Sequence, residues 1–197
     1  MRLSILIMGF CACIAAPLNA ASIPASGSLK FDVIRKGKDI GDHSYKFSGS
    51  VNSYSVKVTT NIVVKVPLIK ITAYSFQHNF VETWKNGKLQ KLSSTTNDDG
   101  TPHKVNAGAS SILPASLWNE DIVKSKTLLN TMNGKKMSIR AADLGNEAIK
   151  TKRGKVNAEH YRISGELERD LWYDANGNLA RVSFKADDGS KVFYVRK

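Results

Sequence analysis

The chain has 197 residues, with 29 Lys or Arg against 17 Asp or Glu and a formal net charge of +12. This excess favours contact with polyanions such as lipopolysaccharide, anionic lipid headgroups or acidic polysaccharide. No nucleic-acid-binding motif is recognisable, which argues against a nucleic-acid partner. The length suits a single domain.

The N-terminus predicts a secretory signal peptide. Arg2 precedes an uncharged run from Leu3 to Ala16, which is too short to span a bilayer. We expect cleavage after Ala20 or Ala21, so that residues 1–21 are the signal peptide and the mature protein is periplasmic. No later stretch is long and apolar enough to predict a transmembrane segment.

Both cysteines, Cys11 and Cys13, lie inside this predicted signal peptide. The mature chain of about 175 residues would therefore have no disulfide, and that length is enough to bury a core. Its net charge would be +11, because Arg2 is removed as well. Lipoprotein anchoring through Cys13 is a minor alternative, although Phe10 stands where that signal normally has an aliphatic residue.

Alternating apolar and polar residues predict strands through the first half of the mature chain. Residues 22–28 are small and polar and predict a flexible leader, and residues 29–197 are expected to form one domain. From Tyr54 to Val66 most even-numbered residues are apolar, which predicts a strand of about 13 residues. Pro67 should end it. The apolar face then changes parity between Ala73 and Tyr74, which predicts a β-bulge.

The segment from Ile112 to Trp118 breaks the alternation. Leu113 and Leu117 are four residues apart, and Pro114 suits the first turn of a helix. We therefore expect one short helix near Pro114 to Trp118 that plugs the concave side of the sheet.

Turn signals and renewed alternation predict further strands in the second half. Asn-Gly or Asp-Gly pairs fit primed hairpin turns, because both residue types tolerate positive φ. Five such pairs occur, at positions 86–87, 99–100, 133–134, 176–177 and 188–189. The predicted fold class is all-β and mainly antiparallel: a single strongly curved sheet, β-spiral or half-barrel of about ten strands wrapped around one short helix.

Two segments carry a resemblance to a known family. They are residues 31–41, FDVIRKGKDIG, and residues 171–179, LWYDANGNL. The chain resembles uncharacterised exported bacterial proteins of domain of unknown function 6134, related to domain of unknown function 3108. The resemblance implies a β-spiral or half-barrel in the cell envelope, similar in shape to the half-barrels that carry lipoproteins through the periplasm. It transfers no catalytic residue.

No residue pattern predicts an active site, a metal site or a cofactor. His78 and Glu82 share a strand face, but a metal needs three or four converging ligands and only His43 and His103 could join them. Glu159 and His160 are adjacent, so on a strand they point to opposite faces. No serine lies in a Gly-x-Ser-x-Gly motif. We therefore expect that the protein is not an enzyme, and a hydrolase with an unrecognised site is the second alternative.

Two non-catalytic functions remain. The first is binding or scaffolding in the cell envelope, through contact with anionic lipid, lipopolysaccharide or an envelope protein. Its polyanion-binding candidates are Lys150, Lys152, Arg153 and Lys155. The alternative is a carrier of a lipid or acyl chain in the concave face, with ligand-binding candidates Tyr45, Phe47, Tyr54, Phe76, His78, Phe80 and Trp118.

Overall fold

The computed structural model describes residues 23–66, 69 and 71–197. The predicted signal peptide, its cleavage site, both cysteines and Pro67 lie outside the described residues.

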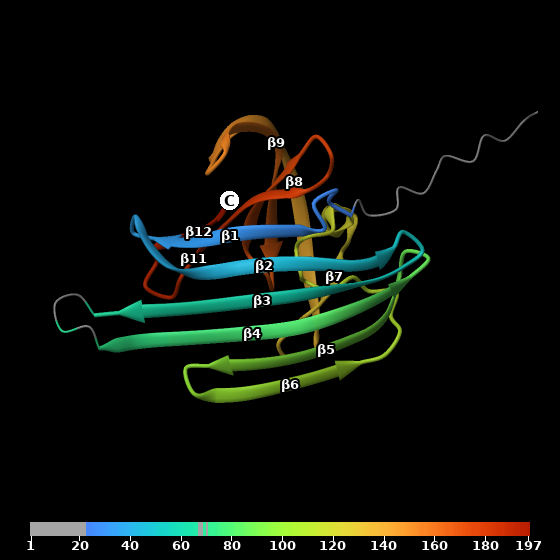
Figure 1. Ribbon diagram of the computed structural model, residues 1–197, viewed down its shortest axis with the longest axis horizontal. Helices are drawn as coiled ribbons and strands as arrows, with labels where there is room; N and C mark the ends of the chain where they lie inside the picture. The colour runs from blue at the N-terminus through green and yellow to red at the C-terminus, as the bar shows by residue number, and fades with distance from the viewer. Residues whose placement is uncertain (1–22, 67–68, 70) are drawn as a thin grey trace, which may run out of the picture.

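The described residues form an antiparallel all-β fold with almost no helix (Figure 1). The first half contains β1 (Ser28–Arg35), β2 (Lys38–Ser50), β3 (Ser53–Lys65), β4 (Thr72–Lys85), β5 (Lys88–Asp98) and β6 (Thr101–Ala107). The second half contains the 3₁₀ helix η1 (Glu120–Lys124) and β7 (Thr127–Leu129), β8 (Lys136–Thr151), β9 (Gly154–Gly165), β10 (Arg169–Asp174), β11 (Leu179–Lys185) and β12 (Lys191–Arg196).

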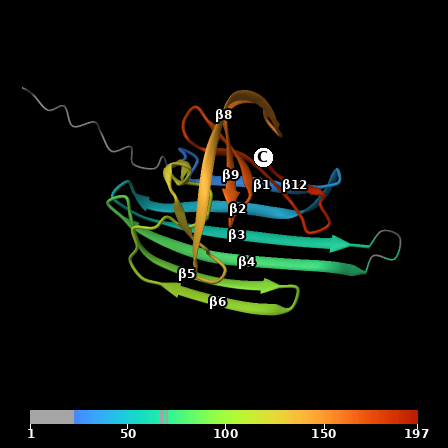
Figure 2. The same ribbon diagram turned by 180° about the vertical axis from the view of Figure 1, so that it is seen from behind.

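The strands make one open sheet in the order β6-β5-β4-β3-β2-β1-β12-β11-β10-β9-β8-β7. Strands that are neighbours in the sheet are also consecutive in the sequence, with the exception of β1 and β12. The pairing of β1 with β12 joins the two halves of the sheet. The sheet curls so strongly that β8 crosses the long strands of the first half at a steep angle, as Figure 2 shows. The predicted fold class is confirmed, but the sheet has twelve strands rather than about ten.

The β-bulge predicted near Ala73 is confirmed. Val64 pairs with Tyr74 and Lys65 pairs with Thr72, so Ala73 is the extra residue. The predicted 13-residue strand is also present as β3.

The five turn pairs are not all of the predicted primed type. Asn86-Gly87 and Asp99-Gly100 have positive φ at both residues, as two-residue primed hairpin turns require, and so does Lys36-Gly37. At positions 176–177 and 188–189 only the glycine has positive φ. Here the loop closes through bonds such as Gly177 N–H to Asp174 O and Asp174 N–H to Asn178 O, which is a type I turn followed by a bulge.

The helix predicted near Pro114 to Trp118 is absent, although this segment does cover the concave side. Leu117 has a φ of 67°, which is incompatible with a right-handed helix. The backbone bonds of the segment go to β7 instead: Leu129 N–H donates to Leu113 O, and Ala115 N–H donates to Leu129 O. We call residues 108–119 the strap. The five-residue η1 follows it, capped by the Asn119 side chain.

The strap joins the two halves of the sheet. The Tyr45 hydroxyl of β2 donates to Ser116 O at 2.6 Å, and the Tyr173 hydroxyl of β10 donates to Leu117 O at 2.7 Å. Both tyrosines are buried in the main core, where the Trp118 ring packs against Phe47 and Trp84. The concave side is therefore a packed interior built from both halves and the strap.

Candidate functional site

The candidates for a concave ligand site are core residues. Tyr45, Phe47, Tyr54, His78, Phe80 and Trp118 are buried, and Phe76 is half-buried. The structure brings most of them together, but their side chains fill the interior against the strap.

A buried carboxyl group lies at the centre of this interior. Glu82 Oε2 accepts hydrogen bonds at 2.9 Å from the indole N–H groups of both Trp84 and Trp118, whereas Oε1 has no partner. Burial raises the pKa of Glu82, and the nearby Ser116 hydroxyl and the hydrogen bonds from the Trp118 and Trp84 indoles oppose that rise. Two indoles are donors only, so they fix the carboxyl group without taking a proton from it.

Two buried histidines lie in the same interior. His43 Nδ1 and Thr60 Oγ1 are 2.7 Å apart, and His78 bonds Thr96 through Nδ1 and Thr131 through Nε2. Burial lowers the pKa of His43 to about 3, with a further contribution from His78, and lowers that of His78 to about 4. Both rings are therefore neutral at pH 7.

The histidines do not assemble a metal centre with their neighbours. His103 lies exposed on the edge strand β6 and does not join them. Across residues 23–66, 69 and 71–197, no group of three or more His, Cys, Asp or Glu side chains could hold a metal ion.

The four polyanion candidates gather at the turn between β8 and β9. We call residues 150–155 the basic tip. Its backbone is anchored on the outer side of the sheet, because Lys152 N–H donates to Arg196 O and Arg181 Nη2 donates to Lys150 O. Lys152 Nζ also pairs with the buried Asp32 at 2.7 Å. Lys150, Arg153 and Lys155 are exposed and form no ion pair with any described residue.

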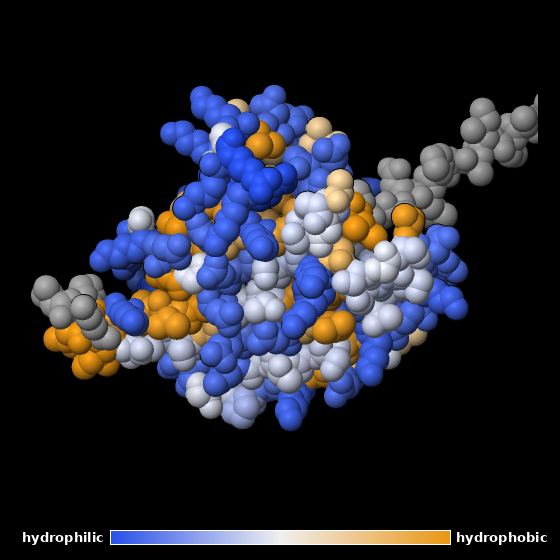
Figure 3. All heavy atoms as spheres, viewed as in Figure 1, coloured by the Kyte–Doolittle hydropathy of each residue, from blue (hydrophilic) through white to orange (hydrophobic). Residues whose placement is uncertain are grey.

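Hydrophilic and hydrophobic side chains are concentrated in different regions of the molecular surface (Figure 3). Hydrophilic side chains dominate the upper part of this view, where β8 and β9 turn. Hydrophobic side chains gather where β3 ends and β4 begins, and Val63, Val66, Ile69 and Ile71 are exposed there.

Sequence reasoning missed a polar network on the outer face of β8, β9 and β10. His160 lies between two carboxylates, with Nδ1 3.0 Å from Glu147 Oε1 and Nε2 3.3 Å from Asp170 Oδ1. Its ring stacks on Trp172 at 4.2 Å. The adjacent Glu159 is not its partner: the carboxylates come from neighbouring strands, whose register no local pattern reveals.

His160 in this outer-face network is not placed to act as a general base. Each imidazole nitrogen of His160 already faces a carboxylate, so neither is free to accept a proton from a substrate. Arg162 Nε also donates to Asp170 Oδ1 at 2.8 Å, which compensates the second carboxylate. The arrangement stabilises the packing of the β8–β9 hairpin, whose Ile149 and Ala158 pack against Trp172.

Comparisons with known proteins agree with the fold. A family described as "Domain of unknown function (DUF6134)" matches residues 31–197. The crystal structure of a beta-barrel-like protein of domain of unknown function DUF1849 from Brucella abortus is similar, with a TM-score of 0.58 and 9% sequence identity. The match covers 86% of this chain and 94% of that one. No curated protein matches. In the part of the chain that the structure describes, no helix has the length and hydropathy of a membrane span.

Proposed function

We propose that this chain, which belongs to the DUF6134 family of unknown function, is a non-catalytic binding protein of the periplasm that associates with anionic components of the cell envelope. The N-terminal sequence supports the location, because a short uncharged run follows Arg2. The basic tip carries the proposal for binding.

The basic tip supports anion binding because its backbone is held in place while three of its four cations have no ion-pair partner among the described residues. Lys152 pairs with Asp32, its N–H donates to Arg196 O of β12, and the Arg181 side chain of β11 donates to Lys150 O. The three remaining cations, Lys150, Arg153 and Lys155, project from this anchored turn into solvent. A hairpin whose backbone is already anchored loses little loop freedom when it meets a polyanion.

The carrier alternative has less support. It requires space along the concave face, whereas the aromatic side chains that would line such a space are buried against the strap. We therefore do not propose that an acyl chain occupies the interior.

The test is cosedimentation of the purified mature protein with vesicles that contain phosphatidylglycerol. We expect binding to weaken as salt rises from 50 to 500 mM, because the screening length falls from about 10 Å at 0.1 M towards a few ångströms. Lys150→Gln, Arg153→Gln and Lys155→Gln together should weaken binding on the order of a hundredfold, at about 1 kcal/mol for each basic side chain near an anionic surface.

A matched control removes three charges elsewhere. Lys88, Lys91 and Lys104 are exposed on β5 and β6, in the first half of the sheet. Their replacement by Gln gives the same net charge as the tip variant and should change vesicle binding far less. Equal losses for both triple variants would show that net charge alone governs association and would remove the tip from the proposal.

A further inference from the structure

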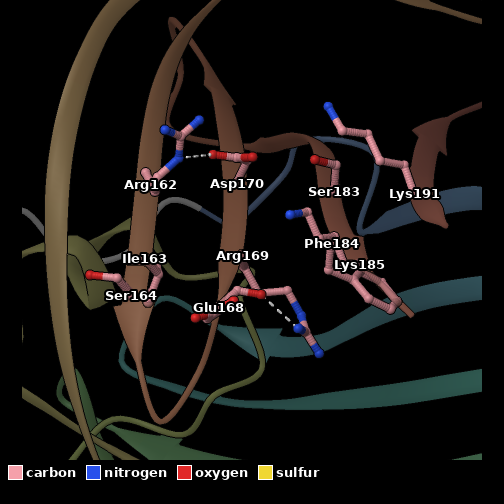
Figure 4. A pocket seen from close by; sticks show the side chains of 10 residues that line it. All are labelled: Arg162, Ile163, Ser164, Glu168, Arg169, Asp170, Ser183, Phe184, Lys185 and Lys191. Carbon is pink, nitrogen blue, oxygen red and sulfur yellow. Dashed lines mark hydrogen bonds and ion pairs between the residues drawn. The ribbon is translucent and has the colours of Figure 1, made fainter. Parts of the chain in front are cut away.

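A pocket of about 410 Å³ is lined mainly by residues of β9 to β12 (Figure 4). The tip contacts the Arg196 end of β12, whereas the pocket is bordered by Lys191 at the other end of that strand. The two ends are five positions apart along an extended strand, which is about 17 Å. The pocket has the size of a small-molecule site.

The pocket carries an excess of positive charge. Its lining contains four cations and two carboxylates. Lys185 and Lys191 lie directly opposite each other on β11 and β12, and neither ammonium group makes an ion pair or hydrogen bond with a described residue. Like charges at directly opposed positions destabilise a sheet. An anion between them would remove that repulsion.

A row of polar side chains, two of them hydrogen-bond donors, lies beside these lysines. Arg162, Asp170 and Ser183 occupy paired positions on β9, β10 and β11, and Figure 4 shows their side chains on the same side of the strands. Arg162 uses Nε for Asp170, so its two terminal nitrogens remain available. Ser183 is buried to 4% exposure, yet its hydroxyl forms no hydrogen bond with a described residue.

We propose that this pocket binds a phosphomonoester. A phosphomonoester carries a charge of about −1.5 to −2 at neutral pH, which matches the two unpaired lysines. Its oxygens are strong acceptors, and the guanidinium of Arg162 and the hydroxyl of Ser183 supply directed donors. Asp170 does not oppose the anion with a full free charge, because Arg162 and His160 both contact it. This site is separate from the basic tip and does not depend on it.

Isothermal titration calorimetry with inorganic phosphate and with glycerol 3-phosphate tests the proposal, at pH 7.5 and an ionic strength fixed with sodium chloride. We expect saturable binding of both to the mature protein. The double variant Lys185→Gln/Lys191→Gln should bind at least tenfold more weakly, and Ser183→Ala several-fold more weakly. Lys150→Gln/Lys155→Gln, which removes two charges from the basic tip, should bind as the unmodified protein does.

A second arm distinguishes the source of the phosphate. Binding to vesicles that contain phosphatidic acid is compared in proteins that already carry the three tip substitutions. There, Lys185→Gln/Lys191→Gln should weaken vesicle binding if the ligand is a lipid headgroup and leave it unchanged if the ligand is a free small molecule. Absence of phosphate binding, or equal binding by the pocket and tip variants, would overturn the proposal. Circular dichroism verifies that each variant folds. Loss of salt-sensitive binding to phosphatidylglycerol in the tip variant tests the proposed function independently of these outcomes.

Discussion

Glu82 is a single residue whose pKa is raised by its buried surroundings. Its carboxyl group is fully buried, accepts two indole N–H groups through one oxygen and leaves the other without a partner. Because burial raises its folded pKa above the unfolded value, its contribution to stability is full below about pH 4.5 and is lost as pH rises through the folded pKa.

Replacement of Glu82 by Gln should therefore change stability in a pH-dependent way. The Gln amide stays neutral and its oxygen can still accept hydrogen bonds from both tryptophans. The variant should therefore become more stable relative to the unmodified protein as pH rises from 4 to 8. We expect a gain on the order of 1–3 kcal/mol, the cost of an unsatisfied buried polar group. Urea denaturation across this range measures it. A stability difference that stays constant with pH would show that Glu82 does not titrate abnormally.

The two buried histidines predict sensitivity to acid. His43 and His78 have folded pKa values of about 3 and about 4, below the unfolded value of 6.5. Between pH 6.5 and 4 the unfolded chain binds protons that the folded chain does not, so stability is lost as pH falls, by up to about 1.4 kcal/mol per pH unit for each histidine. Glu82 has the opposite effect, because its contribution to stability grows as pH falls. The effect of a histidine is therefore measured by comparing a variant with the unmodified protein. His78→Gln should flatten the decline in urea midpoint, whereas His103→Gln, at an exposed position, should not.

At the level of elements, the strands were predictable and the strap was not. Alternation identifies a strand because one face is buried, and this holds for β3, whose even-numbered residues are mostly buried. Leu113 and Leu117 have helical spacing, yet their backbone is held by β7 and by tyrosines from β2 and β10. These partners are distant in sequence, so local spacing cannot reveal them. The short β7 was missed because three residues are too few to establish a period.

The backbones of the long strands β2 and β3 approach each other closely at two glycines of β2, Gly41 and Gly49, and the contact is tightest at Gly41. At Gly41, with a φ of 150°, an added Cβ would lie 1.9 Å from Asn61 O. Gly41→Ala should force the two strands apart and cost more than the roughly 1–3 kcal/mol of a strained backbone position alone. Gly145→Ala is the control, because its φ of 82° is strained but nothing lies within 4 Å of the added atom. Chemical denaturation compares them, and equal costs would argue against the close contact.

On the scale of the whole molecule, the two halves of the sheet are joined at β1 and β12, and an ion-pair cluster reinforces this seam. Asp32 of β1 is buried and pairs with Lys152 of the basic tip and with Lys197, each at 2.7 Å. Lys197 also pairs with Asp42 of β2. The basic character of residues 150–155 was evident from sequence, but the function of Lys152 as an anchor was not. Its partner lies 120 positions away in the chain and is reached only because the β8–β9 hairpin curls over the sheet.

Asp32→Asn should therefore release the basic tip without unfolding the sheet. Hydrogen bonds from Lys152 and Lys197 lower the pKa of Asp32, so the anchor is fully present above the unfolded value of about 3.8 and is lost as pH falls below it. Hydrogen exchange of the Lys152 amide, which donates to Arg196 O, reports the docking. At pH 7 we expect this amide to exchange at least tenfold faster in the variant, while amides in β3 and β4 remain protected. If the amide exchanges at the same rate, the backbone bonds and the packing of Ile149 hold the tip without the ion pairs. If β3 and β4 lose protection too, Asp32 stabilises the whole sheet rather than the tip.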